Sequence, residues 1–438
     1  MHERDVAIVG GGILGTSVAY WLAARYDGRI VVLEREAQVA MHASRLNTGV
    51  VHRPFYLHPT KARLFARAAQ VSHALWKKYA RERDLPWREA GTYKVAADEA
   101  QVKVLETNMA WAGANGMAPS EVELLDGREV QRREPNLTCA GALLAKTDAC
   151  VDFSAFTGAI RADAEALGVK FLTSAGVRGI DPKVDGVKVS FEGGRPDFRA
   201  AYLINCAGGE SLDIAHMMDL GLEYADLHFR GEYWIVANAA AGLVNRNVYA
   251  VPRQPDLPFL DPHWIVRWNG GREIGPNAVP VSSPRQYEGK FGPPQDWVEK
   301  FFEPPIANKL RLWFNRDFLG VTAREMFSSL SKGEMMRRVQ RFIREIRAEH
   351  LQERGFAGIR SNVLNRHGAM LKEAVELPGP HSYHVINYNS PGATGAPAYA
   401  AYLVDRLTAR GDLDHLAPST KKTAWDWDAI AKAMEFVT

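Results

Sequence analysis

Three things are scarce in this sequence: cysteine, long apolar runs and a surplus of charge of either sign. The 438 residues include three cysteines, Cys139, Cys150 and Cys206. An odd number without metal-ligand spacing argues against a disulfide framework and against a zinc site, and it predicts a reducing compartment. No metal site is therefore expected.

No apolar run reaches the length that a membrane-spanning helix needs. The opening residues, MHERDVAIVGGG, are charged and lead directly into a strand, so no secretory signal is expected. We therefore expect a cytoplasmic protein, and any contact with the inner membrane would be peripheral.

Charge is nearly balanced along the chain. The 54 basic and 51 acidic residues leave a net charge of +3. A nucleic-acid-binding surface needs a clustered basic excess, so no nucleic-acid partner is expected. The length and the 46% hydrophobic composition allow a large core divided between two or three lobes.

Glycine, in contrast, is concentrated near the start of the chain. The stretch DVAIVGGGILGTSVAYWLAARYDGRIVVLERE predicts a buried strand at 6–9, a glycine turn, a helix and a second buried strand at 30–33. Gly10, Gly12 and Gly15 form G-x-G-x-x-G at the turn. These glycines tighten the turn, admit a pyrophosphate and let helix and strand pack closely. The unit predicts a doubly wound, Rossmann-like α/β domain that binds a dinucleotide.

Three further features indicate which dinucleotide is bound. Glu34 ends the second strand, where a carboxylate accepts ribose hydroxyls and disfavours NADP. In YLINCAGG, the small residues Ala207 and Gly208 end a later strand and admit a cofactor. NSPGATGAPAYAAYLV opens a helix whose N-terminus would stabilise negative charge on a reduced flavin, which favours FAD over NAD. The candidate cofactor-binding residues are Gly10, Gly12, Ile13, Leu14, Gly15, Glu34, Arg35, His42, Ser44, Asn47, Thr48, Val177, Ala207, Gly208, Pro391, Gly392, Ala393 and Thr394.

A second lobe interrupts this domain. Residues 217–354 are dense in aromatics and prolines and predict antiparallel strands with helices, an α+β substrate domain. The basic amphipathic stretch GEMMRRVQRFIREIRAEH predicts a long helix that packs on the core or, as an alternative, lies on a membrane. The expected division is a discontinuous FAD-binding domain of 1–85, 150–216 and 355–415, a substrate domain of 86–149 and 217–354, and a tail helix in 416–438 that caps the fold or serves an oligomer contact.

Several motifs together carry a family resemblance. They are NTGVVH (Asn47–His52), VDF (Val151–Phe153), NCAG (Asn205–Gly208), FRGEY (Phe229–Tyr233), PFL (Pro258–Leu260), GPNAV (Gly275–Val279), GIR (Gly358–Arg360) and HVINYNSPGAT (His384–Thr394). The chain resembles the FAD-dependent oxidoreductases of the D-amino-acid-oxidase/glycerol-3-phosphate-dehydrogenase superfamily, and within it the L-2-hydroxyglutarate oxidase/dehydrogenase branch. The resemblance implies a flavin domain roofed by an antiparallel sheet, and oxidation of a 2-hydroxy acid to a 2-oxo acid.

The chain also departs from that branch. The branch usually reads His-Asn-Ser-Gly where this chain has Leu46-Asn47-Thr48-Gly49. It then has a small Ala-Gly pair where this chain has Arg53 and Pro54. If this segment lines the substrate pocket, the substrate need not be 2-hydroxyglutarate.

Oxidation of a 2-hydroxy acid needs a base for the hydroxyl proton and a cation for the carboxylate. We expect His52 to be the base, because imidazole titrates near neutral pH; the alternative is a structural histidine. His263 and His384 are the reserve candidates. For the cation we expect Arg360 and Arg230, although Arg230 could instead pair with Glu232.

Other polar side chains are candidates for binding the substrate. Arg53 would attract a second anionic group on the substrate, or it forms an ordinary ion pair. The remaining candidates are Tyr56, Tyr233, His263, Asn277 and Asn389. The expected function is FAD-dependent oxidation of a small anionic 2-hydroxy acid, with oxygen or a quinone as reoxidant. The alternatives are an amine or amino-acid oxidase and, last, a non-catalytic flavin-bound interaction protein.

Overall fold

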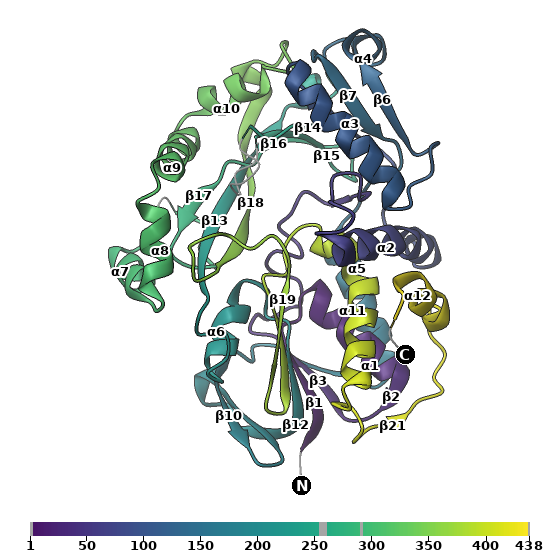
Figure 1. Ribbon diagram of the computed structural model, residues 1–438, viewed down its shortest axis with the longest axis vertical. Coiled ribbons are helices and arrows are strands. Elements are labelled where there is room, and N and C mark those ends of the chain that lie inside the picture. Colours follow the sequence, from purple (N-terminus) through teal and green to yellow (C-terminus); the bar gives the residue numbers. More distant parts are fainter. Residues whose placement is uncertain (1–2, 254–260, 290–291, 437–438) are drawn as a thin grey trace.

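The computed structural model describes residues 3–253, 261–289 and 292–436. Two large sheets dominate it, one at each end of the long axis (Figure 1). The PFL motif, Pro258–Leu260, lies outside the described residues. Within the described residues, no helix combines the length and the apolar character needed to cross a membrane.

The first sheet has eight strands around a parallel centre. Alternate residues of its first strand face opposite cores: Val6 and Ile8 pack with the helices, while Ala7 and Val9 pack with the other layer. This explains the unbroken apolar run, and it confirms the predicted doubly wound sheet. In order the strands are β10 (Val177–Lys183), β11 (Gly186–Phe191), β12 (Phe198–Asn205), β1 (Arg4–Val9), β3 (Ile30–Leu33) and β9 (Lys170–Leu172); β20 (Ser382–Ile386) pairs with β12, and β19 (Val375–Gly379) with β20.

Helices from three distant parts of the chain pack together beside this sheet. They are α1 (Ile13–Arg25), α5 (Phe153–Ala166) and α11 (Gly392–Ala409), with α2 (Arg63–Glu82) packed on α11 (Figure 1). The indole of Trp21 donates to the carbonyl of Pro397 (2.9 Å), which ties α1 to α11. On the other side, α6 (Ser211–His216) packs on β12 and β20.

The C-terminal tail caps this lobe. Its helix α12 (Trp427–Met434) packs on α11 and α2, and β21 (Ala417–Pro418) pairs with β2 (Tyr26–Asp27). Trp425 is 1% exposed, with its ring centroid 5.0 Å from that of Tyr79. Of the two roles expected for the tail, capping is therefore the one that the contacts support.

The second sheet has nine strands and is antiparallel except where β14 pairs with β5. Its two longest strands, β13 and β18, pair with each other and run down toward the first sheet (Figure 1). In order the strands are β17 (Val279–Val281), β13 (Ala225–Val236), β16 (Arg272–Gly275), β15 (His263–Val266), β14 (Asn247–Ala250), β5 (Thr92–Ala96), β7 (Gly141–Ala145) and β6 (Val122–Asp126); β18 (Leu351–Leu364) pairs with the other edge of β13.

Six helices accompany this sheet. One group, α7 to α10, follows its outer edge in Figure 1, and α3 and α4 lie near β6 and β7. Their bounds are α3 (Glu99–Ala114), α4 (Gly127–Arg133), α7 (Pro294–Phe302), α8 (Ile306–Trp313), α9 (Arg316–Leu330) and α10 (Lys332–Val339).

The long basic helix expected around 333–350 is wrong in extent. The helix α10 ends at Val339, and the following residues form turns. Val339, Phe342, Ile343 and Ile346 are buried against the second sheet. The apolar side chains of this segment pack into the core, so they are not available to bind a membrane.

One expected domain boundary also needs revision. The division at residue 355 falls inside β18, which pairs with β13 along its whole length, from Leu351 opposite Val236 to Leu364 opposite Ala225. A boundary there would cut a continuous ladder. We therefore propose that the substrate domain extends to residue 364.

Candidate active site

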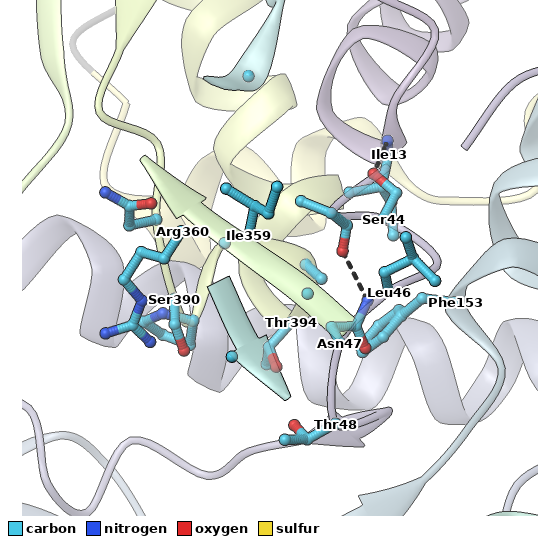
Figure 2. Close-up of a pocket in the computed structure, with 18 of the residues that line it drawn as sticks. Ile13, Ser44, Leu46, Asn47, Thr48, Phe153, Ile359, Arg360, Ser390 and Thr394 are labelled. Carbon is cyan, nitrogen blue, oxygen red and sulfur yellow. Dashed lines mark hydrogen bonds between the residues drawn. The ribbon is translucent and has the colours of Figure 1, made fainter. Parts of the chain in front are cut away.

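The glycine turn leaves no room for a side chain. At Gly10, φ is +105° and an added Cβ would lie 2.5 Å from the carbonyl oxygen of Cys206. A Cβ at Gly15 would lie 2.0 Å from the carbonyl oxygen of Gly10. The N-terminus of α1 thus sits directly against the strand ends. Its first turn receives one side-chain bond from the neighbouring loop, where Ser44 Oγ accepts the N–H of Ile13 at 2.9 Å (Figure 2).

Beside this turn lies a cavity whose polar wall begins at Glu34. The Glu34 carboxylate accepts the N–H groups of Gly11 (2.8 Å) and Glu36 (2.9 Å), and burial raises its pKa. His42 stacks on Tyr287 with ring centroids 5.3 Å apart. Candidate cofactor residues that line this cavity are Gly10, Gly12, Glu34, Arg35, His42, Ser44, Val177, Ala207 and Gly208.

A larger cavity adjoins the first, with Gly12, Ser44 and Gly208 lining both. The space within its walls and at its solvent-open mouth together amounts to about 1510 Å³. It extends from the N-terminus of α1 to that of α11, between the two sheets. Candidate residues that line it are Gly12, Ile13, Leu14, Ser44, Asn47, Thr48, His52, Gly208, Tyr233, His263, Asn277, Arg360, Asn389, Pro391, Gly392, Ala393 and Thr394.

His52 presents one ring nitrogen to this cavity and holds the other against a buried acid. Its Nδ1 lies 2.9 Å from Oδ2 of Asp148, a side chain with 0% exposure. Asp148 is itself fixed, because its Oδ1 accepts the backbone N–H of Arg53 at 2.8 Å. A carboxylate there accepts the Nδ1 hydrogen, which leaves Nε2 able to take a proton.

Two aromatic side chains continue the wall beyond His52. The hydroxyl of Tyr249 lies 3.5 Å from Nε2 of His52. The ring of His263 lies on that of Tyr249, with centroids 3.9 Å apart. Burial lowers the pKa of His263 to about 3, so its imidazole is neutral at working pH.

Arg360 enters the same cavity from β18. It pairs with Phe229 across β13 and β18, so the two side chains leave the same face of the sheet. Within the part of the chain that the structure describes, its guanidinium makes no hydrogen bond and no ion pair. Burial lowers its pKa, which reflects a charge withdrawn from water without a partner. In Figure 2, Arg360 and Ser390 lie at one side of the cavity, and Ile13, Ser44 and Leu46 at the other.

Arg230 does not reach the cavity, so its expected role is wrong. Side chains alternate along a strand, and the cavity-lining residues of β13 are Phe229, Gly231 and Tyr233. Arg230 therefore points to the opposite face, where it is 2% exposed and pairs with Glu232 at 3.0 Å. The ion pair named as the alternative is what forms.

The expectation for Arg53 is corrected in the same way. Its side chain turns away from the cavity and is 5% exposed. Its Nη2 pairs with Glu121 at 2.7 Å, and its Nη1 lies 3.0 Å from Nδ1 of His73. Arg53 is a buried structural cation, so it does not supply a second anion-binding group.

Comparison with known proteins agrees with this geometry. A family model described as FAD dependent oxidoreductase matches residues 5–406. The chain belongs to the FAD-dependent oxidoreductase family. The L-2-hydroxyglutarate dehydrogenase of Salmonella houtenae is 28% identical over 98% of this chain and 99% of its own length. Human mitochondrial L-2-hydroxyglutarate dehydrogenase is 28% identical over 93% of this chain and 89% of its own.

Solved structures with the same fold are more distant in sequence. Dithionite-reduced L-alpha-glycerophosphate oxidase from Mycoplasma pneumoniae, with FAD bound, has a TM-score of 0.72 at 20% identity, covering 96% of this chain and 97% of its own. Glycine oxidase from Geobacillus kaustophilus has a TM-score of 0.68 at 18% identity, covering 98% of both chains. The family and the fold inferred from the motifs are thus confirmed.

The residues of this oxidoreductase fit FAD. The side-chain-free turn at Gly10 and the N-terminus of α1 suit a pyrophosphate, and the Glu34 carboxylate suits the ribose on the smaller-cavity side. At the far end of the larger cavity, α11 begins at Gly392 with no side-chain cap on its first turn. Thr394 anchors that turn, because its Oγ1 accepts the backbone N–H of His52 at 3.1 Å. The two helix N-termini therefore mark the ends of a long, electron-rich ligand.

Of four further candidates of the oxidoreductase, two line the larger cavity with their amides engaged by neighbouring residues, and two lie outside its lining. Tyr56 is absent from the cavity lining and packs edge-on against His52. The amide of Asn277 is occupied by Glu232, through a donated and an accepted bond of 2.9 and 2.8 Å. The Nδ2 of Asn389 donates to the Ser361 carbonyl, and also to Asn387. The reserve base His384 is fully buried in the first sheet, so it cannot serve.

Sequence reasoning missed two residues of this site. Asp148 stands between the apolar strand β7 and the VDF motif. An acidic residue so close to a buried strand indicates a carboxylate with a specific partner. Tyr249 lies in NVYAVP, where nothing distinguishes it from an ordinary core aromatic. Both touch His52, and neither could be connected to it without the fold.

Proposed function

We propose that the protein oxidises a small 2-hydroxy acid to the corresponding 2-oxo acid, with FAD as the first electron acceptor. One observation carries the proposal. The cavity that fits the flavin is lined by a cation without a partner, Arg360, and by a histidine backed by a buried acid, His52 with Asp148. The names of the relatives, L-2-hydroxyglutarate dehydrogenases, agree with a CH–OH donor.

In this proposal His52 is the base. Its Nε2 takes the proton of the substrate hydroxyl, and the Asp148 carboxylate stabilises the imidazolium that forms. Because Asp148 bonds Nδ1 at 2.9 Å and is anchored through the Arg53 N–H, the ring is already oriented before substrate arrives. Tyr249, 3.5 Å from Nε2, can donate to the same hydroxyl oxygen.

Arg360 binds the substrate carboxylate. A guanidinium offers a planar fork of donors that holds a carboxylate through two bonds and so fixes the position of Cα. The side chain is partly buried, and its guanidinium has no ion pair among the residues that the structure describes, so the substrate supplies the missing counter-charge. This arrangement also explains why a cation is tolerated in an aromatic-walled cavity.

When bound, FAD would supply the two-electron acceptor for the Cα hydrogen, which would leave the substrate as hydride. Atoms and electrons then balance, because the C–H electron pair leaves with the hydride, the O–H proton moves to His52, and a C=O bond forms. The uncapped first turn of α11 offers N–H groups to negative charge at the far end of the cavity. We propose oxygen or a membrane quinone as the reoxidant, and a cytoplasmic protein whose contact with the inner membrane, if one forms, is peripheral.

Oxidation of an amine in the same fold is the second candidate. A neutral amine carries its own electron pair, so an oriented base is not required. A hydroxyl substrate needs the oriented base that His52 and Asp148 form, and an amine does not. The pair therefore favours the CH–OH donor. A non-catalytic flavin-binding protein would need neither this pair nor Arg360 in the cavity, so the site also argues against that alternative.

The test is anaerobic reduction of the purified yellow holoprotein. Racemic 2-hydroxy acids and the amino acids of the same carbon skeletons are mixed with it, and loss of flavin absorbance is followed. Bleaching by hydroxy acids supports the proposal. Bleaching by amino acids alone, or a protein that neither carries nor binds FAD, overturns it.

A further inference from the structure

The larger cavity has a single fixed positive charge. Among the described residues that line it, Arg360 is the one arginine, lysine or carboxylate. The two lining histidines do not add a second cation. Burial holds the pKa of His263 near 3, so it stays neutral, and His52 must be neutral to accept a proton.

The cations near the cavity wall are already paired. Arg53 pairs with Glu121 and Arg230 with Glu232. Arg267 reaches Asn47 O at 2.8 Å, but its charge is matched by Glu273 at 2.7 Å. Each of these arginines would have to abandon a buried acid to serve a ligand, and that exchange leaves the acid unpaired.

The surroundings of Arg360 are aromatic. Phe229 is its partner across the β13–β18 ladder. Tyr233 also lines the cavity, and the charge of Arg360 acts against the raised pKa that burial gives its hydroxyl. Tyr233 stacks on Phe356 with centroids 4.8 Å apart, which holds its ring in place. A substrate whose carboxylate binds Arg360 therefore meets uncharged ring faces next to it.

We propose that the substrate is a 2-hydroxy monocarboxylate with an uncharged side chain, and that the site discriminates against a dicarboxylate such as 2-hydroxyglutarate. The inference rests on the proposed function and narrows it. The first carboxylate neutralises Arg360; a second would enter a cavity with no remaining counter-charge. An unpaired buried charge is costly enough to lower kcat/KM by ~100-fold relative to a neutral analogue of equal size.

The experiment compares three 2-hydroxy acids on the holoprotein. They are 2-hydroxyglutarate, its 5-amide, which has the same shape without the second charge, and 2-hydroxyhexanoate, in which an uncharged ethyl group replaces the second carboxylate. The rate of anaerobic flavin reduction is measured against concentration for each. Glutamate, glutamine and norleucine, the matching amino acids, are run in parallel.

We expect the amide and the hexanoate each to exceed 2-hydroxyglutarate by ~100-fold in second-order rate constant. A 2-hydroxyglutarate rate equal to or above that of its amide overturns the inference and leaves the proposed function standing. Reduction by the amino acids alone, or by none of the six compounds, overturns the proposed function and the inference with it. Raising the salt concentration is the control: it should weaken the amide and the hexanoate alike, because each carries one carboxylate and both use the same single cation.

Discussion

Arg360→Gln should make the protein more stable and nearly inactive. Arginine stays protonated at all accessible pH, and burial lowers the pKa of this one, so the folded state disfavours its charge throughout the working range. Arg360 is only partly buried, so solvent reaches part of the guanidinium and reduces the cost of several kcal/mol for a fully buried unpaired charge to about 1 kcal/mol. Glutamine removes that cost and keeps polar contact with cavity water.

The same substitution removes the partner of the substrate carboxylate. Leaving a bound carboxylate unpaired costs about 3–5 kcal/mol, or roughly 10²–10⁴-fold in kcat/KM. Because the carboxylate is bound in the ground state and in the transition state alike, most of the loss should appear in KM. Misplacement of Cα should lower kcat by a smaller factor.

The assay is urea unfolding of substrate-free holoprotein, with steady-state kinetics on the best hydroxy acid. Arg230→Gln is the matched control. It removes one cation from the buried carboxylate of Glu232 and should therefore lower the free energy of unfolding by about 1–3 kcal/mol. The kcat/KM of this variant should stay close to that of the parent. If Arg360→Gln lowers stability as much as this control, Arg360 has a structural partner. If kcat/KM stays within threefold of the parent, Arg360 does not bind substrate.

Three other perturbations probe separate parts of the structure. Asp148→Asn should lower kcat ~10- to 100-fold with little change in KM, because the histidine loses its anionic orienter; steady-state kinetics at full flavin content check this, and an unchanged kcat would contradict it. Gly10→Ala should abolish FAD retention, since φ is +105° and the new Cβ would lie 2.5 Å from a backbone oxygen; absorbance per mole of protein measures it, and full flavin occupancy would refute it. Stability should fall as pH falls from about 6.5 to 4, because burial lowers the pKa of His263 to about 3 and of His228 and His384 to about 4, so the unfolded chain binds protons that the folded protein rejects; urea midpoints at pH 7, 6 and 5 test this, and His384→Gln should flatten the slope.

The cofactor half of the site could be read from sequence because it is local. Gly10, Gly12 and Glu34 lie within one strand–turn–helix–strand unit, where spacing along the chain fixes position in space. The later helix at Pro391 was recognisable for the same reason, as a small-residue turn that opens a helix. A sequence motif predicts a site well where the residues of the site lie close together along the chain.

The substrate half could not be read in this way, because it depends on contacts between distant segments. Asp148 and His52 are 96 positions apart, and Tyr249 and His52 are 197 apart. Arg53 resembled a ligand-binding cation from its place next to His52. Only the fold shows that neighbours on a bent loop point in opposite directions, one into the cavity and the other toward Glu121.

The two arginines of the β13–β18 ladder show how strand register determines the chemistry. Arg360 stands opposite Phe229, and Arg230 opposite Ile359, so the two guanidinium groups leave opposite faces of the same pair of strands. In Figure 2, Ile359 and Arg360 accordingly point to different sides of β18. A slip of one residue would turn Arg360 to the other face of the strand pair and take its charge out of the cavity. The sheet therefore does more than roof the flavin: its register decides that one cation, and not two, faces the substrate.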